Sequence, residues 1–393
     1  MKILYGYRNS SCEPGIIWTM RYMGHELIFT ERNVENPDTD TEYMDMVERQ
    51  VKREQADMVF SINFVPVLSR VCAKCHVPYF CWIIDSPVIH LYSDTLYNSC
   101  NYIFIFDYTL YAEFHDRNPQ HIFYLPLGAD MELFDGIQVT EKDRERYGSD
   151  ISFVGSLYTE KCTYDTIEHR LPDYLQGFFA GALNAQRMVY GYNFLKEILS
   201  EEIVAILRET VSINQCDGYR IDPRVLFWIL LNSKCTEMER IHILNTIAER
   251  FPVVLYTASD VSSLHNVDCR ESVSSLEGMP KVFKCSKINL NFTAKGIQTG
   301  VPLRIYDVLG CGGFLISNYQ AELAEQFEVG KEIVLFESEE DLLEKIDYYL
   351  AHEEERRQIA ENGYERVKRE YSYQKRLEHM FQIYESISKE NRA

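Results

Sequence analysis

Short apolar stretches alternate with longer amphipathic stretches along the first third of the chain. The apolar stretches carry almost no polar residues and predict strands at residues 2–5, 27–29, 57–62, 79–84, 102–106 and 122–125. The amphipathic stretches predict helices, most clearly at residues 16–23, 42–54 and 65–75. Strands that are apolar along their whole length are typical of a parallel sheet covered on both faces. We therefore expect residues 1–135 to form a doubly wound, Rossmann-like α/β domain.

The same alternation returns in the second half of the chain. Residues 136–149 are polar and weakly periodic, and we expect them to form a linker. A new series begins with a strand at 150–154 and continues with strands at 252–256, 287–291, 313–317 and 332–336. We expect a second Rossmann-like domain over 150–372, with a helical insertion at about 172–250. The last helix, 373–393, is predicted to cross back to the first domain.

Composition and charge narrow the classes of ligand. The chain has 393 residues, and its 40 basic and 60 acidic residues give a net charge of −20. Nucleic acids and anionic membranes are bound by basic surfaces, so we expect neither as a partner. No window approaches the ~18 uncharged apolar residues of a membrane-spanning helix. The 11 cysteines are dispersed, with one CxxC at Cys72–Cys75, and we expect structural thiols, no metal site and a cytoplasmic protein.

The turn after the first strand of the second domain is the first candidate for a phosphate-binding site. Gly155 and Ser156 follow the strand at 150–154, and Lys161 comes a few residues later. Glycine lets a phosphate approach the backbone, a helix N-terminus offers free N–H groups, and lysine adds positive charge. An ordinary turn between a strand and a helix has the same pattern, so both interpretations stay open.

The segment that follows the strand at 287–291 is more informative. Gly300 precedes Pro302, which we expect at the first position of a short helix. Arg304 and Asp307 are three residues apart and share one face of that helix. An arginine fork one turn into a helix suits a diphosphate, and an acid one turn later suits ribose hydroxyls. The alternative is an ion pair between Arg304 and Asp307 at the surface.

The segment from Gly300 to Ser317 resembles the donor-nucleotide motif of the CgeB-type (spore maturation protein-like) glycosyltransferases. The shared pattern is Gly-Xaa-Pro-Leu-Arg, an acid three residues on, and Gly-Gly-Phe-Leu. Further resemblance covers nearly the whole chain, at residues 82–87, 125–130, 153–158, 190–194, 362–364 and 371–376. The resemblance implies a GT-B fold, in which two Rossmann-like domains face each other across a cleft. It also implies a nucleotide-sugar donor on the second domain and no metal or other cofactor.

The same resemblance assigns roles to the candidate residues of the second domain. A UDP-sugar is the most expected donor, and a protein or a surface-glycan precursor is the expected acceptor. Asp307 would bind the ribose, and the diphosphate would be held by Gly155, Ser156, Lys161, Gly300 and Arg304. Retaining GT-B enzymes often carry two glutamates eight positions apart in this region. Asp307 matches the second of them, but Thr299 occupies the first position, which leaves the stereochemical outcome open.

The first domain is expected to bind the acceptor. Asp85 directly follows the strand at 79–84, where it could take a proton from an acceptor hydroxyl. It could instead cap the next segment or bind a sugar hydroxyl. His90 is the second candidate for the general base, and Asp107, also at a strand end, is more easily explained as structural. The DxD of metal-dependent transferases occurs at Asp38–Asp40, but there it precedes a helix and is expected to be a cap or an exposed turn.

Two other functions fit the same fold. A nucleotide-sugar epimerase would turn over the donor without an acceptor. A non-catalytic protein would bind nucleotide or glycan during surface-layer assembly, and Thr299 in place of a carboxylate keeps this alternative open.

Overall fold

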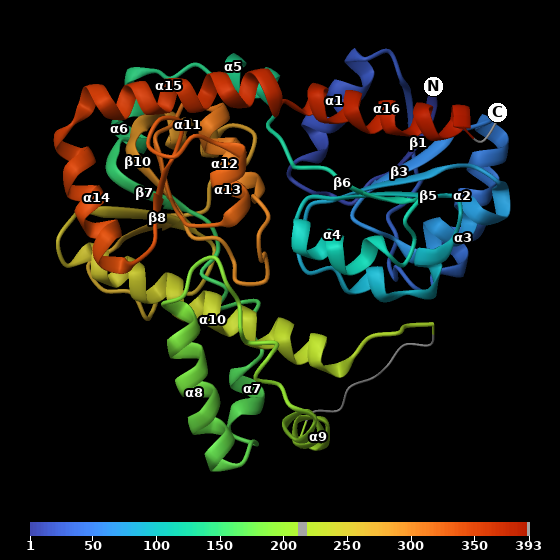
Figure 1. Ribbon diagram of the computed structural model, residues 1–393. Helices are drawn as coiled ribbons and strands as arrows, with labels where there is room; N and C mark the ends of the chain where they lie inside the picture. The colour runs from blue at the N-terminus through green and yellow to red at the C-terminus, as the bar shows by residue number, and fades with distance from the viewer. Residues whose placement is uncertain (211–217, 391–393) are drawn as a thin grey trace. The chain divides into compact units, whose positions relative to one another are not determined.

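The computed structural model describes residues 1–210 and 218–390. Seven residues of the predicted insertion and the last three of the predicted C-terminal helix, 211–217 and 391–393, lie outside the described residues. The described chain divides into two compact units, shown in Figure 1. The first consists of residues 1–132, 218–220 and 370–390, and the second of residues 133–210 and 221–369.

A six-stranded sheet forms the centre of the first unit, with strand order β2-β1-β3-β4-β5-β6 and parallel pairing throughout. Its strands are β1 (Lys2–Gly6), β2 (Glu26–Phe29), β3 (Met58–Ile62), β4 (Tyr79–Ile83), β5 (Asn101–Ile105) and β6 (Ile122–Tyr124). The three central strands β3, β4 and β5 are buried at every position. This burial explains why their sequences are apolar without alternation, and the parallel sheet predicted from that pattern is confirmed.

Helices cover the first sheet, including the helix that ends the described chain. They are α1 (Glu13–Tyr22), α2 (Thr41–Glu54), α3 (Pro66–Cys75), α4 (Tyr108–His115), the short 3-10 helices η1 (Ile89–Tyr92) and η2 (Asp94–Tyr97), and α16 (Tyr373–Glu390). The rings of Phe381 and Tyr384 lie 6.1 and 5.3 Å from the ring of Phe80 in β4. The apolar face of α16 therefore packs on this sheet rather than on the second one.

The second unit also contains a six-stranded parallel sheet, with strand order β12-β11-β10-β7-β8-β9. Its strands are β7 (Ser149–Val154), β8 (Val253–Thr257), β9 (Asp268–Glu271), β10 (Ser286–Asn291), β11 (Leu315–Asn318) and β12 (Val334–Phe336). The sequence pattern missed only β9. That strand pairs with one neighbour, β8, and is mostly exposed, so its residues are polar and give no apolar signal.

The helices of the second unit include the predicted insertion between β7 and β8. The unit contains α5 (Met131–Gly136), α6 (Glu141–Tyr147), α7 (Asp165–Glu168), α8 (Asp173–Arg187), α9 (Glu201–Thr210), α10 (Pro223–Ala248), α11 (Gly278–Cys285), α12 (Leu303–Gly310), α13 (Ala321–Gln326), α14 (Glu339–Ala351) and α15 (Glu353–Glu370). Helix α6 lies inside the segment expected to be a linker, where Thr140 and Asp143 form a capping box. A helix of 7 residues is too short to show a clear period.

Residues 218–220, in the predicted insertion, belong to the first unit. The backbone N–H of Asp94 donates to the carbonyl oxygen of Gly218 at 2.8 Å, and that of Arg220 donates to the carbonyl oxygen of Tyr92 at 3.0 Å. The guanidinium of Arg220 also forms an ion pair of 2.8 Å with Asp94. Residues 218–220 thus pair with the linker between η1 and η2, a contact that the sequence pattern did not predict.

Candidate functional site

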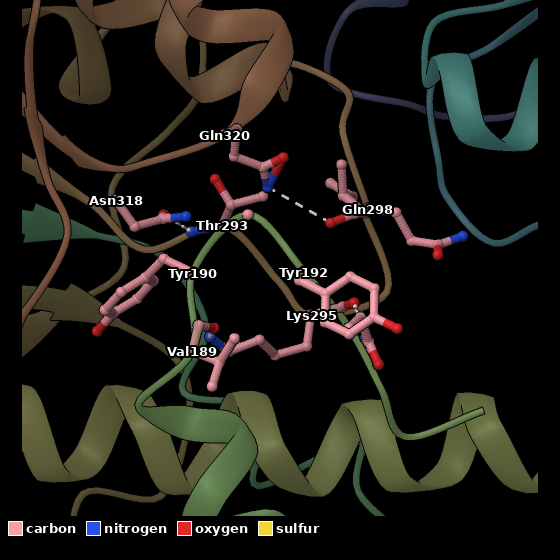
Figure 2. Close-up of a pocket in the computed structure, with 11 residues that line it drawn as sticks. Val189, Tyr190, Tyr192, Thr293, Lys295, Gln298, Asn318 and Gln320 are labelled. Atoms are coloured by element: carbon pink, nitrogen blue, oxygen red, sulfur yellow. Dashed lines mark hydrogen bonds between the residues drawn. The ribbon is translucent and has the colours of Figure 1, made fainter. Parts of the chain in front are cut away.

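The C-terminal ends of the strands in the second unit meet at one edge of the sheet, as in any parallel sheet. A small hollow lies at this edge, beyond β10 and β11 (Figure 2). Three segments line the hollow: a turn of the insertion at 189–193, the loop after β10, and the residues that end β11 and follow it. Open α/β sheets bind ligands at this edge, so the hollow is the candidate site of the unit.

The turn of the insertion is held in one conformation by its own residues. Gly191 has a φ of 75°, and a Cβ atom there would lie 2.8 Å from the ring of Tyr319. The side-chain amide of the buried Gln186 donates to the carbonyl oxygen of Tyr192 and accepts from the N–H of Phe194, both at 2.8 Å. The turn therefore requires a glycine at 191 and presents a fixed backbone to the hollow.

Amide side chains join the three lining segments. The Nδ2 atom of Asn193 donates to the carbonyl oxygen of Lys295 at 2.8 Å and to Oδ1 of Asn232 in α10 at 2.7 Å. The Oδ1 atom of Asn318, at the end of β11, accepts from the N–H of Thr293 at 2.7 Å. These bonds connect the insertion, the loop after β10 and the end of β11, so the walls of the hollow are fixed relative to one another.

A buried ion pair lies in the wall of the hollow. The ammonium of Lys295 is 2.8 Å from the carboxylate of Glu239 in α10, and the two side chains are only 8% and 2% exposed. The ammonium also donates to the carbonyl oxygen of Val189 at 3.3 Å and lies 4.7 Å from the ring centre of Tyr190. Burial and the neighbouring Glu239 carboxylate raise the pKa of Tyr190, so its phenol stays protonated at neutral pH.

The next residue of α10 connects the ends of two strands. The Nη1 atom of Arg240 donates to the carbonyl oxygen of Ser156 at 2.6 Å, and Nη2 donates to that of Phe292 at 2.5 Å. Its guanidinium also lies 4.9 Å from the ring centre of Tyr158. Burial lowers the pKa of Arg240, but arginine remains charged in proteins. A fixed positive charge therefore lies beneath the turn that follows β7.

The predicted phosphate-binding turn after β7 carries a carboxylate that sequence reasoning missed. The Oγ atom of Ser156 donates to Glu160 at 2.5 Å, and Ser259 donates to the same carboxylate at 2.7 Å. Burial of Glu160 favours its neutral form, but these two hydrogen bonds outweigh burial and lower its pKa to about 2. The ammonium of Lys161 lies 4.7 Å from the ring centre of Tyr158. Gly155, Ser156 and Lys161 are thus close together at the sheet edge, with Glu160 among them.

Arg304 and Asp307 contact each other in the first two turns of α12. Nη1 of Arg304 lies 3.4 Å from Oδ2 of Asp307, so the two side chains form an ion pair. Such a pair was the alternative explanation for their spacing in the sequence. The Arg304 guanidinium also contacts the sulfur of Met279 and lies 5.3 Å from the ring centre of Phe283, both in α11. Its side chain is 25% exposed. Pro302, expected at the first helical position, is instead the N-cap residue of α12.

Gly300 lies in the same loop as the lining residues of the hollow. The loop runs from the end of β10 to the N-cap of α12, so it carries Lys295 near its start and Gly300 near its end. Gln320, which follows β11, donates from Nε2 to the carbonyl oxygen of Ile297 at 3.4 Å, as Figure 2 shows. The predicted diphosphate-binding loop and the hollow are therefore parts of one structure.

In the first unit, Asp85 follows β4 at the C-terminal edge of the sheet. Its Oδ2 atom accepts from Nδ2 of Asn63 at 2.6 Å, and Oδ1 of Asn63 accepts from the N–H of Ile84 at 3.0 Å. Asn63 follows the neighbouring strand β3 and has a φ of 56°. The Asp85 carboxylate is exposed. Asn63 therefore orients an accessible carboxylate at the edge where parallel sheets bind ligands.

His90 and Asp107 occupy different environments at the same edge. His90 is the second residue of η1, where burial lowers its pKa and the nearby Asp38 carboxylate opposes this effect. Asp38 accepts a hydrogen bond from the hydroxyl of Tyr219. Asp107 is fully buried, accepts from the N–H of Thr109 at 3.2 Å and caps α4. The structural interpretation of Asp107 is confirmed.

The Asp-Thr-Asp sequence at 38–40 has the predicted capping role. Oδ1 of Asp40 accepts from the N–H of Tyr43 at 2.9 Å and caps α2. The carboxylate also pairs with Arg32, whose hydrogen bond lowers the pKa of Asp40 to about 2. Within residues 1–210 and 218–390 no group of three or more His, Cys, Asp or Glu side chains is arranged to hold a metal ion. No helix in the same ranges has the length and apolar character needed to cross a membrane.

Several solved structures resemble the chain over nearly its whole length. A glycosyltransferase from Rickettsia africae is 13% identical, with a TM-score of 0.56 and coverage of 99% of this chain and 98% of that chain. HepE from Anabaena, in complex with UDP-glucose, is 10% identical, with a TM-score of 0.57 and coverage of 99% and 100%. Sucrose-phosphate synthase from Thermosynechococcus elongatus is 9% identical, with a TM-score of 0.52 and coverage of 98% and 99%. The fold is therefore GT-B, as the sequence resemblance implied.

A protein-family model matches part of the chain, within the second unit and α16. Residues 240–382 match the model described as "Glycosyl transferase-like". The matched segment begins at Arg240 and includes Lys295, Arg304 and Asp307. A sequence comparison with curated proteins finds no match. The family similarity thus covers the loop after β10 and the start of α12, the same part of the sheet edge that contains the hollow.

The structure adds residues of α10 that sequence reasoning did not single out. Asn232, Thr236, Glu239 and Arg240 are all buried polar residues of one helix. Asn232, Thr236 and Arg240 follow one another at intervals of four residues and Glu239 is three residues after Thr236, so all four lie towards one side of α10. Polar residues that recur at this spacing along α10 were the available signal, although the helix also carries other polar residues such as Lys234 and Glu237.

Proposed function

We propose that the protein is a glycosyltransferase that moves a sugar from a nucleoside diphosphate, most simply UDP, to an acceptor hydroxyl. The observation that carries the proposal is the hollow at the C-terminal edge of the second GT-B sheet, lined by a loop within the segment that matches glycosyltransferases. The GT-B protein HepE, crystallised with UDP-glucose, supports a UDP-sugar as the donor. The CgeB-type motif at Gly300–Ser317 supports the narrower proposal of a CgeB-type enzyme.

In this proposal the second unit binds the donor. Arg304 and Lys161 neutralise the diphosphate, assisted by Gly155, Ser156 and Gly300, and Asp307 binds the ribose hydroxyls. Departure of the diphosphate places negative charge on its oxygens, and preorganised cations stabilise that charge in the transition state. The hydroxyl of Ser156 must exchange its bond to Glu160 for one to a phosphate oxygen, because a hydroxyl donates only one hydrogen bond.

The first unit supplies the acceptor chemistry in the proposal. Asp85 accepts the proton of the acceptor hydroxyl, whose oxygen then forms a bond to the anomeric carbon of the sugar. The bond from that carbon to the diphosphate oxygen breaks, and the electron pair leaves with the nucleoside diphosphate. Asn63 keeps the Asp85 carboxylate in position through its bond of 2.6 Å. His90 is the alternative base, because burial lowers its pKa and keeps it neutral at physiological pH.

A nucleotide-sugar screen followed by a turnover assay tests this function. At 100 times its dissociation constant, a true donor stabilises the folded protein by ~2.7 kcal/mol, so thermal unfolding identifies the nucleotide and the sugar. The bound nucleotide sugar is then incubated with candidate acceptors while release of nucleoside diphosphate is measured. A transferase releases it in an acceptor-dependent manner. An epimerase produces a new nucleotide sugar without release, and a non-catalytic protein does neither, so either outcome would refute the proposal.

A further inference from the structure

A larger pocket lies at the opposite edge of the sheet in the second unit. It occupies about 330 Å³ where β10 and β11 begin, between the end of α11, the segment before β11 and the first turns of α15. Sites for small-molecule ligands span roughly 300–1,000 Å³, so the pocket can hold such a ligand. The hollow described above lies at the other ends of the same strands, so the two sites are separate.

The side chains around this pocket are mostly basic, although the chain as a whole has a net charge of −20. Five cations line it, namely Arg144, Lys284, Lys287, Arg356 and Arg357. Among the described lining residues, Glu353 is the sole carboxylate. We call the site the basic pocket. A concentration of positive charge in an acidic protein indicates a local preference for anions.

Only part of this positive charge is compensated by neighbouring acids. Three of the five cations form ion pairs, which join Arg144 to Glu141, Lys287 to Asp150 and Arg357 to Glu353. Lys284 and Arg356 form no ion pair with any residue in the ranges 1–210 and 218–390. Glu353 and Asp150 act on Arg356 only at longer range, and both already pair with another cation.

Arg356 is the most unusual of these cations, because it is only 6% exposed. A guanidinium carries five N–H donors, but among the described residues only the carbonyl oxygen of Tyr349 accepts a hydrogen bond from this one. Burial lowers the pKa of Arg356, although arginine remains charged in proteins. A buried charge without a partner is costly. An anion in the pocket would remove that cost, since Arg356 lines it.

Helix dipoles explain the position of Lys284 but not that of Arg356. Lys284 lies in the last turn of α11, where the carbonyl ends of a helix favour a cation. Arg356 is the fourth residue of α15, near the end of the helix that favours an anion. The position of Arg356 therefore does not serve the stability of α15. A bound anion would interact favourably with both the guanidinium and this end of the helix.

A neighbouring hollow of about 380 Å³ indicates what else the ligand carries. The residues that line both spaces are Lys284, Gly312, Arg357 and Ala360. The neighbouring hollow is also lined by the carboxylates Asp135 and Glu361 and by Tyr364. Carboxylates accept hydrogen bonds from hydroxyl groups but repel a second phosphate. The part of the ligand beyond its anionic group is therefore expected to be neutral and hydroxylated.

We propose that the basic pocket binds a phosphate ester of a small hydroxylated molecule, such as a sugar phosphate, with Arg356 and Lys284 on the phosphate group. The planar arginine fork matches phosphate oxygens, and the carboxylates of the neighbouring hollow match hydroxyl groups. The site does not depend on the proposed glycosyltransferase function, because neither cation belongs to the proposed donor site.

Calorimetric titrations with glucose 6-phosphate, inorganic phosphate and glucose test the site. Arg356→Met and Lys284→Met each remove one unpaired cation of the pocket. Lys281→Met is the matched control, because Lys281 lies in α11 one turn before Lys284 but does not line the pocket. Arg304→Ala removes a cation of the proposed donor site and so detects phosphate binding there. Circular dichroism establishes that each variant is folded, and if Arg356→Met does not fold, Lys284→Met decides.

We expect wild type, Lys281→Met and Arg304→Ala to bind glucose 6-phosphate with the same dissociation constant. Each pocket variant should bind it at least about tenfold more weakly, the loss typical of a hydrogen bond to a charged group. Glucose should not bind, and inorganic phosphate should bind more weakly than the ester. An unchanged dissociation constant in either folded pocket variant, or a loss of binding in Arg304→Ala, would refute the site. Equal affinity for inorganic phosphate would refute the ester, and a wild-type protein that binds neither phosphate compound would refute the proposal.

Discussion

The guanidinium of Arg304 lies 3.4 Å from the carboxylate of Asp307, one turn further along α12. The same guanidinium lies 5.3 Å from the ring centre of Phe283, so an ion pair and an aromatic ring both fix its orientation. One quarter of the Arg304 side chain remains exposed, but burial of the guanidinium lowers the pKa of Arg304, so the charged group itself is largely desolvated. To bind a diphosphate, the guanidinium would therefore have to exchange part of its contacts with Asp307 and Met279 for phosphate oxygens.

Replacement of Arg304 tests its role in donor binding. Arg304→Ala should weaken UDP binding by one to two orders of magnitude, because a hydrogen bond to a charged group contributes about 1.5–3 kcal/mol. Arg304→Lys should restore only part of the affinity, since lysine lacks the planar fork. Arg270→Ala is the control, because Arg270 also pairs with an aspartate, Asp268 at 2.6 Å, but on the edge strand β9. Wild-type affinity of Arg304→Ala in calorimetric titration would remove Arg304 from the donor site.

The Asp85→Asn variant tests whether Asp85 acts in proton transfer rather than in donor binding. The amide can keep a hydrogen bond to a neighbour but cannot accept the acceptor proton, so kcat should fall at least a hundredfold. The dissociation constant of the donor should stay at the wild-type value. Asn63→Ala should lower kcat by a smaller factor, because it removes only the group that orients Asp85. If Asp85→Asn retains kcat while His90→Gln loses it, the base is His90.

Gly191→Ala tests the conformation of the insertion turn. The added Cβ would meet the Tyr319 ring at 2.8 Å in a backbone with a φ of 75°, so we expect a loss of about 1–3 kcal/mol in the free energy of unfolding. Gly181→Ala is the matched control, because Gly181 lies in α8 and has no atoms within 4 Å of the added Cβ. The control should gain about 0.5–1 kcal/mol through helix propensity. Denaturant unfolding gives the free energy of unfolding of both variants. Equal values for Gly191→Ala and Gly181→Ala would contradict the conformation of the turn at Gly191.

The ion pair between Asp40 and Arg32 predicts how the free energy of unfolding changes at low pH. The hydrogen bond from Arg32 lowers the pKa of Asp40 from 3.8 to about 2, so the folded protein binds this proton less readily than the unfolded chain. The stabilisation is fully present above about pH 4 and is lost as the pH falls towards 2. Asp40→Asn should therefore be less stable than wild type at pH 5, and the difference should shrink between pH 4 and pH 2. A difference that stays constant over this range would contradict the shifted pKa.

The sequence predicts those parts of the fold that depend on local pattern. The buried central strands, such as β3 and β4, are apolar along their length and were placed within a residue or two. The edge strand β9 was missed because its exposed residues need no apolar side chains. Helix α6 was missed because it is short and polar on most of its surface.

The candidate site could be predicted only in part, for a different reason. Arg304 and Asp307 are close in sequence, so their contact follows from helix geometry. Lys295 and Glu239 lie far apart in the sequence and meet only because α10 packs beside the loop after β10. No local pattern encodes such a contact, although the polar face of α10 indicates that one exists. The pairing of residues 218–220 with Asp94 in the first unit is non-local in the same way.

Saturation-transfer NMR with UDP-glucose tests the central claim most directly, because it detects the uracil, ribose and glucose protons of the bound ligand separately. We predict that wild type saturates protons of all three groups and that excess UDP abolishes the signals. Absence of saturation in the wild-type protein, with UDP-glucose and with GDP-mannose alike, would contradict a nucleotide-sugar site at this sheet edge.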